Sequence, residues 1–305
     1  MSVFSELLRR DTFVLTAELD PPRSANASAV RRRAGALKGF VDAVNVTDNN
    51  RAIAAMAAIP AAIIVRDVGI EPIVQMTGRD RNRIALQSDV LGAAALGLEH
   101  FVFMSGDDPK RGNHPDAVNV KDLDGIGLVK MAVAMRDEAK FLSGDPIKTP
   151  PSYLVGATAS PFTKPMDAEV TKTAAKIAAG ADFIQTQPVF DLATFSQWLS
   201  EVRRVAPRTT AILAGVLVLR SAEQAMRLAK IPGFVIGDEF VRRLERASDP
   251  EREGAAIATQ MVRSLRALPG VRGVHLYAID RPEAVARVVE DAGLLPRPNM
   301  REAVR

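Results

Sequence analysis

Short hydrophobic runs alternate along this chain with longer segments in which apolar residues recur every three or four positions. A short apolar run favours a buried strand, and a period near 3.6 favours an amphipathic helix. The expected strands cover 13–19, 41–47, 72–77, 100–106, 152–159, 182–187, 210–216 and 273–279. The expected helices lie near 27–39, 52–68, 80–97, 122–143, 166–180, 191–205, 221–230, 238–247, 250–268 and 281–293.

This alternation predicts an α/β fold, a (β/α)₈ TIM barrel that forms a single domain over residues 1–305. A doubly wound open sheet is the alternative. No glycine-rich dinucleotide fingerprint follows a predicted strand, so the barrel is favoured. Gly97 and Gly180 should each end a predicted helix by adopting the left-handed conformation. Pro60 should interrupt or restart the second helix.

Composition narrows the class of protein. The chain is 47% hydrophobic and 25% charged, which is ordinary for a globular fold. No apolar stretch is long enough to suggest a membrane span. The first residues carry charges within their apolar run and predict a short helix rather than a signal peptide. The absence of cysteine excludes disulfides, thiolate nucleophiles and cysteine-based metal sites, and a cytoplasmic location is the default.

The charge and the histidines point to a small-molecule site rather than a macromolecular one. The net charge of +4 comes largely from arginines on helical segments, typical of solvated faces or of mild attraction for an anionic small molecule. Aromatic residues make up only 5%, so no nucleic-acid partner is expected. His100, His114 and His275 lack metal-ligand spacing, so we expect no metal and interpret them as surface or hydrogen-bonded residues. Homo-oligomerisation is left open.

Polar residues gather where the predicted strands end. In "LTAELDPPR", Glu18 closes an apolar strand that Pro21 and Pro22 terminate, because proline lacks the N–H that a ladder needs. The later strands end in Thr47, Asp48, Gln75, Thr77, Ser105, Gly106, Asp107, Thr158, Gln187, Tyr277, Asp280 and Arg281. In a barrel these ends meet at one rim, where barrel enzymes place their active sites. The turn-rich segment 106–121 belongs to the same face.

Several motifs, in order along the chain, resemble the methylenetetrahydrofolate reductase family. They are "AELDPPR", "VNVTDN", "SGDDP", "KIAAGADFIQTQPVFD" and "HLYAIDR". The run from Ala179 to Asp191 is the most specific of them. The segment "MTGRDRNRIALQSDVLGAAALG" and the GNHP loop look most like the bacterial one-carbon-pathway branch, which includes acetogen-type enzymes.

The resemblance implies a flavin-bearing barrel in which NADH or NADPH reduces FAD, or FMN, and a methylene-pterin is then reduced to the methyl-pterin. Glu18 would be the general acid that opens the pterin's five-membered ring, and Asp107 would act beside it as a second catalytic residue. Gln187, Tyr277 and Arg281 would bind the reduced pterin. The implied cofactor contacts are Thr47, Gln75, Thr77, Ser105, Gly106, Asp107, Thr158, Glu169 and Lys176.

Some positions depart from the family pattern. Gln75 replaces a histidine near the flavin, Ser105 replaces a basic residue, and Glu169 stands where aspartate is usual. "ATASPF" replaces a Tyr-Pro segment. A flavin-independent reductase is therefore the nearest alternative, acting on tetrahydrofolate or tetrahydromethanopterin. A non-catalytic barrel subunit of a one-carbon enzyme complex is the alternative from another class, disfavoured because a scaffold needs no proton donor.

Overall fold

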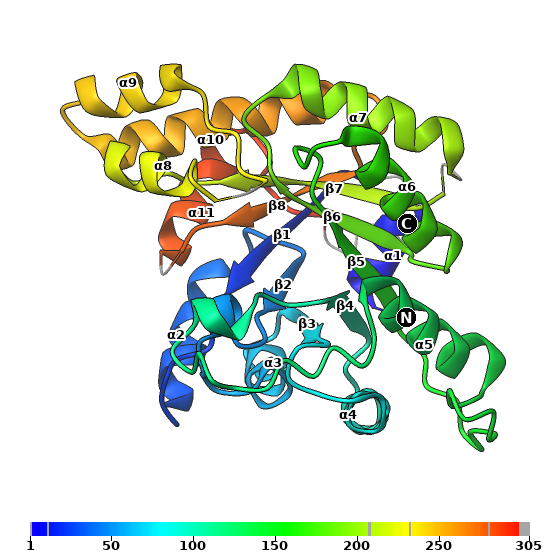
Figure 1. The fold of residues 1–305 in the computed structure, drawn as a ribbon. Helices are drawn as coiled ribbons and strands as arrows, with labels where there is room; N and C mark the ends of the chain where they lie inside the picture. The colour runs from blue at the N-terminus through cyan, green and yellow to red at the C-terminus, as the bar shows by residue number, and fades with distance from the viewer. Residues whose placement is uncertain (1, 11, 207–208, 232, 280, 299–305) are drawn as a thin grey trace.

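Eight parallel strands close into a barrel in the order β1 to β8, which confirms the predicted fold class (Figure 1). The computed structural model describes residues 2–10, 12–206, 209–231, 233–279 and 281–298. The strands are β1 Val14–Leu19, β2 Ala43–Val46, β3 Glu71–Thr77, β4 His100–Met104, β5 Leu154–Ala159, β6 Phe183–Pro188, β7 Ala211–Leu217 and β8 Gly273–Tyr277. Each predicted strand overlaps its observed counterpart, and β1 pairs with β8 to close the ring.

Helices surround this barrel. They are α1 Val3–Arg9, α2 Ala27–Leu37, α3 Ala58–Asp67, α4 Arg83–Ala95, α5 Gly125–Val133, α6 Met166–Ala178, α7 Leu192–Val205, α8 Ala222–Leu228, α9 Asp238–Arg246, α10 Pro250–Ala267 and α11 Pro282–Asp291. Short helical turns cover Asn50–Ala52, Pro109–Arg111 and Ala134–Glu138. Among the described residues, no helix is long and apolar enough to cross a bilayer.

Four helix boundaries follow from the residues that lie at them. Pro60 lies in the first turn of α3, where its missing N–H costs nothing, so residues 53–57 stay outside the helix. Gly97 and Gly180 adopt φ angles of +80° and +100° after α4 and α6, as the sequence predicted. The predicted helix over 122–143 is shorter, because α5 passes into one wider turn that ends at left-handed Ala139.

The barrel interior changes character along its axis. At the amino-terminal end of the strands, Phe4 of α1 inserts against Phe183, their ring centroids 5.5 Å apart and both fully buried. Val14, Ile73 and Leu213 complete this apolar plug. Side chains two residues further along β1, β2, β6 and β8 are polar and buried, namely Thr16, Asn45, Gln185 and His275. Alternation along a strand sends i and i+2 to the same face, so the next interior layer opens onto the carboxyl-terminal rim.

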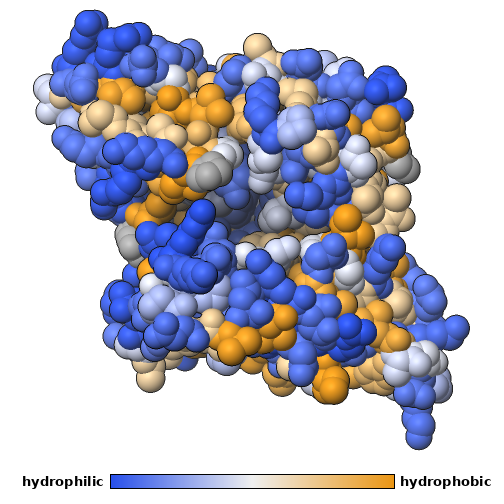
Figure 2. Space-filling model, in the orientation of Figure 1, coloured by the Kyte–Doolittle hydropathy of each residue, from blue (hydrophilic) through white to orange (hydrophobic). Residues whose placement is uncertain are grey.

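The carboxyl-terminal side carries an additional hydrophobic cluster around α8 and α9. Leu219, Ala225, Ile236 and Leu244 are buried within it, and Phe234 packs against its edge. Figure 2 shows this face hollowed near its centre, with hydrophobic side chains between α8, α9 and the hollow. The hollow is the mouth of the barrel.

Candidate active site

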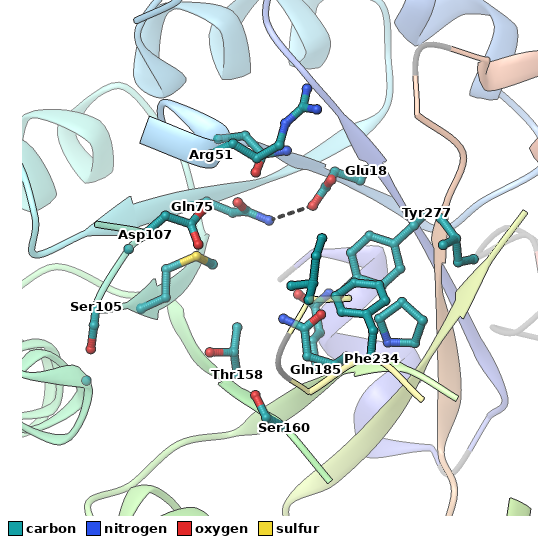
Figure 3. Close-up of a pocket in the computed structure, with 18 of the residues that line it drawn as sticks. Glu18, Arg51, Gln75, Ser105, Asp107, Thr158, Ser160, Gln185, Phe234 and Tyr277 are labelled. Carbon is teal, nitrogen blue, oxygen red and sulfur yellow. Dashed lines mark hydrogen bonds between the residues drawn. The ribbon is translucent and has the colours of Figure 1, made fainter. Parts of the chain in front are cut away.

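A cavity of about 620 Å³ occupies the carboxyl-terminal mouth of the barrel. This volume is typical of small-molecule sites. Ten residues predicted from the sequence line it, namely Glu18, Gln75, Ser105, Gly106, Asp107, Thr158, Glu169, Lys176, Gln187 and Tyr277. In Figure 3, Glu18 and Gln75 face each other, with Tyr277 on one side and Asp107 on the other. The structure thus brings together residues from β1, β3, β5, β6, β8, α6 and the loop after β4.

Glu18 is held near the floor of this cavity. It is the last interior-facing residue of β1, and its side chain is only 15% exposed. Its Oε2 accepts a hydrogen bond from Gln75 Nε2 at 3.3 Å and lies 4.0 Å from His275 Nε2. No arginine or lysine among the described residues forms an ion pair with this carboxyl group. A mostly buried acid without a cationic partner is suited to exchanging a proton with a ligand.

Gln187 and Tyr277 form the adjoining wall. The register of β6 against β7 shifts between Gln185 and Pro188, and Gln187 lines the cavity two positions beyond Gln185. Glycine is needed on the facing strand, because a Cβ at Gly215 would lie 2.7 Å from the Gln187 carbonyl oxygen. The Tyr277 hydroxyl donates to the Thr186 carbonyl at 3.1 Å. Burial, and next the charge of Glu18, raise the pKa of Tyr277 well above its usual value, so the phenol stays neutral.

A more polar wall lies between β5, α5 and α6. Lys176 is buried, and its Nζ donates to the Thr158 carbonyl at 2.6 Å. Burial lowers the pKa of Lys176, partly offset by the nearby charge of Glu169. Glu169 in turn accepts from the Ser160 backbone N–H at 2.8 Å. The first residues of α5, Gly125 and Ile126, line the same side, so a cation and a helix amino terminus both border this part of the cavity.

Asp107 reaches the cavity from the loop after β4. Gly106 precedes it with φ +82°, and a Cβ there would press on Arg79 and Thr77 at 3.0 and 3.1 Å, so glycine is required. The buried Arg79 donates to the carbonyls of Asn49 and Asp107, at 3.1 and 3.5 Å, and its guanidinium also pairs with Asp80. Arg79 therefore joins the loops after β2 and β4. The Asp107 carboxyl group itself is exposed at the cavity wall.

Three predicted residues do not line the cavity. Thr47 donates to Asp20 at 2.7 Å, and Thr77 donates to Asp48 at 3.0 Å; both threonines are almost fully buried. Arg281 directly precedes α11, and its guanidinium pairs with Glu251 at 2.8 Å. Asp280 lies outside the described residues. Thr47 and Thr77 thus form hydrogen bonds within the rim and do not face the cavity. Arg281 forms its ion pair at the outer edge of the rim.

The structure adds lining residues that the sequence did not single out. Arg51, at φ +56°, is exposed at the mouth and has no hydrogen bond or ion pair among the described residues. Leu228, Ile231 and Phe234 form an apolar side. No strand-end position or motif marked them, because they come from loops and from α8. Gln185 was detectable, since period-two alternation places it on the same face as Gln187. No group of three or more metal-ligating side chains occurs within the described part of the chain.

A closed parallel barrel with a polar cavity at the carboxyl ends of its strands defines the class of TIM-barrel proteins with an enzyme-like site. Residues 3–293 match the family model described as methylenetetrahydrofolate reductase. The chain belongs to the methylenetetrahydrofolate reductase family.

Relatives are distant in sequence. The 5,10-methylenetetrahydrofolate reductase of Pectobacterium carotovorum is 25% identical over 75% of this chain and 72% of its own length. Methylenetetrahydrofolate reductase 1 of Schizosaccharomyces pombe is 29% identical over 43% of this chain, and the probable NADPH-type enzyme of Caenorhabditis elegans is 23% identical over 77%. These two alignments span only 22% and 34% of the eukaryotic proteins.

Solved structures support the same fold. A protein from Clostridium thermocellum, described as binding two copies of 5-methyl-5,6,7,8-tetrahydrofolic acid, aligns with a TM-score of 0.68 at 15% identity over 95% of this chain and 98% of its own. A long-chain alkane monooxygenase aligns with a TM-score of 0.54 at 10% identity over 93% of this chain and 92% of its own. At such identities the likeness concerns the fold alone.

Proposed function

We propose that this protein reduces methylene-tetrahydrofolate to methyl-tetrahydrofolate with hydride from NADH or NADPH, by way of a bound flavin, FAD or FMN. The observation that carries the proposal is Glu18, a mostly buried carboxyl group that faces the cavity from the end of β1 without a cationic partner. Family membership and the ten predicted residues that share the cavity support it.

Glu18 would supply the proton that opens the imidazolidine ring of the substrate. Protonation of a ring nitrogen breaks its bond to the bridging methylene carbon, which becomes an iminium carbon able to accept hydride. A positioned acid of this kind contributes about 10²–10⁴-fold to a rate. Gln75 would orient the carboxyl group, because its amide N–H donates to Oε2 and leaves the other oxygen, Oε1, for the ligand.

The remaining cavity residues would bind the pterin. The Gln187 amide can donate and accept at once, which suits the mixed donors and acceptors of a pterin ring. The Asp107 carboxylate would favour the cationic iminium electrostatically. Leu228, Ile231 and Phe234 offer an apolar side against which an aromatic ring could pack.

The wall of Lys176 and the start of α5 fits a flavin nucleotide. A cation beside a helix amino terminus is suited to phosphate, and Ser105 and Thr158 add polar groups on the same side. When bound there, flavin would relay hydride between nicotinamide and pterin. Gly125 borders this wall, and a Cβ at that position would lie at ordinary contact distance from Ser105 Oγ and Lys176 Cε.

Transfer of hydride directly from the nicotinamide, without flavin, is a second candidate. A first observation favours this route: two of the implied flavin contacts, Thr47 and Thr77, donate hydrogen bonds to Asp20 and Asp48 outside the cavity. In addition, Gln75 binds Glu18 where the family pattern has a histidine near flavin. Glu18 would serve either route, since both need the ring-opening proton.

The experiment is an anaerobic assay of the purified full chain with NADH or NADPH and methylene-tetrahydrofolate, with methyl-tetrahydrofolate measured by chromatography. Absorbance near 450 nm, before and after addition of FAD or FMN, separates the two routes. The same assay with methylene-tetrahydromethanopterin tests the pterin. No methyl product from either pterin under any of these conditions would overturn the proposal.

A further inference from the structure

His275 lies directly behind Glu18, in the buried polar layer of the barrel. Its side chain is 1% exposed, and Nε2 lies 4.0 Å from Glu18 Oε2. Nε2 is buried and has no hydrogen-bond partner among the described residues. A buried ring nitrogen is costly to leave unpaired, so its position beside the carboxyl group needs an explanation.

The other ring nitrogen is held by a chain of hydrogen bonds that begins across the barrel. Asn45 and Gln185 pair reciprocally through their amides, at 2.7 and 3.1 Å. This pairing directs Gln185 Nε2 toward Thr16 Oγ1 at 3.3 Å and His275 Nδ1 at 3.5 Å. Thr16 Oγ1 lies 2.8 Å from the same Nδ1.

These contacts specify which nitrogen of His275 carries the proton. An amide nitrogen can only donate, and Gln185 Nε2 gives one of its two hydrogens to Asn45 Oδ1. Its second hydrogen is shared between Thr16 Oγ1 and His275 Nδ1, so both of these atoms act as acceptors. The Thr16 hydroxyl, which receives from Gln185, is then free to donate to Nδ1. With Nδ1 accepting, the ring proton of neutral His275 resides on Nε2, directed at Glu18.

We infer that His275 is a positioning residue whose Nε2–H supports the carboxylate that Glu18 becomes when it gives up its proton. The inference rests on the proposed function for its catalytic consequence, but the orientation of the ring stands on the hydrogen bonds alone. Negative charge on Glu18 would draw Nε2–H closer than the present 4.0 Å. Removing the donor would leave that carboxylate without this hydrogen bond, so the negative charge that forms on Glu18 would be less well stabilised.

Other groups near Glu18 do not duplicate this contact. Gln75 faces it from β3 and is neutral, and Tyr277 faces it from β8 with a pKa raised well above its usual value, first by burial and then by the Glu18 charge. The remaining titratable residues that line the cavity are Arg51, Asp107, Asp124, Glu169, Lys172 and Lys176. Of the described histidines, only His275 has a ring nitrogen directed at Glu18.

The direct test is nuclear magnetic resonance of protein labelled with ¹⁵N in its three histidines. The His275 signals are assigned by their loss in a His275 variant, and the ¹⁵N shifts report the tautomer. We expect neutral His275 to carry its proton on Nε2 and this resonance to move in Glu18→Gln. A proton on Nδ1, or no response to Glu18→Gln, would overturn the inference whether or not the protein reduces a pterin.

The kinetic test uses two variants that separate the ring nitrogens. In His275→Gln the amide nitrogen falls near the place of Nε2, and in His275→Asn near that of Nδ1. We expect the pH at which pterin reduction declines to stay near the wild-type value in the first variant and to rise by about one to two pH units in the second. Equal behaviour of the two variants would overturn the positioning role. A wild-type protein without pterin reduction would instead refute the proposed function.

Discussion

Gln75 on β3 donates its amide N–H to the carboxyl group of Glu18 on β1 at 3.3 Å, across the end of β2. The donor is an uncharged amide. It therefore orients the carboxyl group through one oxygen and does not form an ion pair with it. This arrangement motivates the first prediction.

Glu18→Gln should leave the fold intact and reduce formation of methyl-tetrahydrofolate by about 10²–10⁴-fold, because an amide cannot deliver the ring-opening proton. If flavin is bound, its reduction by NADH should change little. Rapid mixing of each half-reaction separately measures both effects. Glu201→Gln on the outer surface of α7 is the matched control. Equal losses in both half-reactions would point to a general disturbance of the site.

Gln187→Glu should raise the apparent KM for the pterin more than it slows oxidation of the nicotinamide. The carboxylate keeps the size of the amide but loses its donor, which would leave an acceptor on the ring unpaired. We expect an increase in KM of about tenfold or more, from steady-state assays at fixed nicotinamide. An unchanged pterin half-reaction would show that Gln187 does not contact the substrate.

Lys176→Met should weaken binding of a flavin nucleotide, because it removes the cation buried beside the start of α5. Loss of one charge-assisted contact predicts an affinity about 10–100-fold lower. Fluorescence quenching of added FAD measures it. Lys130→Met is the control, since Lys130 is an exposed lysine on α5. Matching flavin affinities in the two variants would contradict the proposal that Lys176 and the start of α5 bind the flavin phosphate.

Glu71→Gln should destabilise the fold by about 1–2 kcal/mol at pH 7. Glu71 accepts from the backbone N–H groups of Val3 and Phe4 at 2.6 and 2.9 Å, which caps α1, and it contacts His100 at 3.1 Å. Burial alone would raise the pKa of Glu71, but these hydrogen bonds lower it below its usual 4.5.

The pH dependence of that difference follows from the lowered pKa. The stabilisation by Glu71 is complete above the unfolded value near 4.5 and is lost as the pH falls through the lower folded value. Urea unfolding of both proteins between pH 7 and pH 3 should therefore show the gap closing in acid. Glu99→Gln, at an exposed position beside β4, should show no such gap.

The barrel was predictable because its signals are local. Each strand is a short apolar run, and glycines such as Gly97 and Gly180 mark where helices end. The rim residues followed from one geometric rule, the convergence of strand ends, which correctly brought Glu18, Gln75, Gln187 and Tyr277 into one cavity.

The rest of the site depends on side-chain direction and on loops, which the strand pattern does not encode. Thr47 directly follows β2 and Thr77 ends β3, yet the half-buried Asp20 and the buried Asp48 accept their hydrogen bonds and hold them away from the cavity. Arg51 comes from a turn with left-handed residues that no motif announced. His275 was interpreted as an ordinary histidine because its importance depends on Thr16 and Gln185, which are distant in sequence.

The Phe4 ring has a consequence for how ligands reach the cavity. By packing against Phe183, it closes the amino-terminal end of the barrel, and the cavity opens at the carboxyl-terminal mouth. If a nicotinamide and a pterin both occupied the cavity beside Gln187, they would have to bind there one after the other. Each substrate in excess would then inhibit binding of the other.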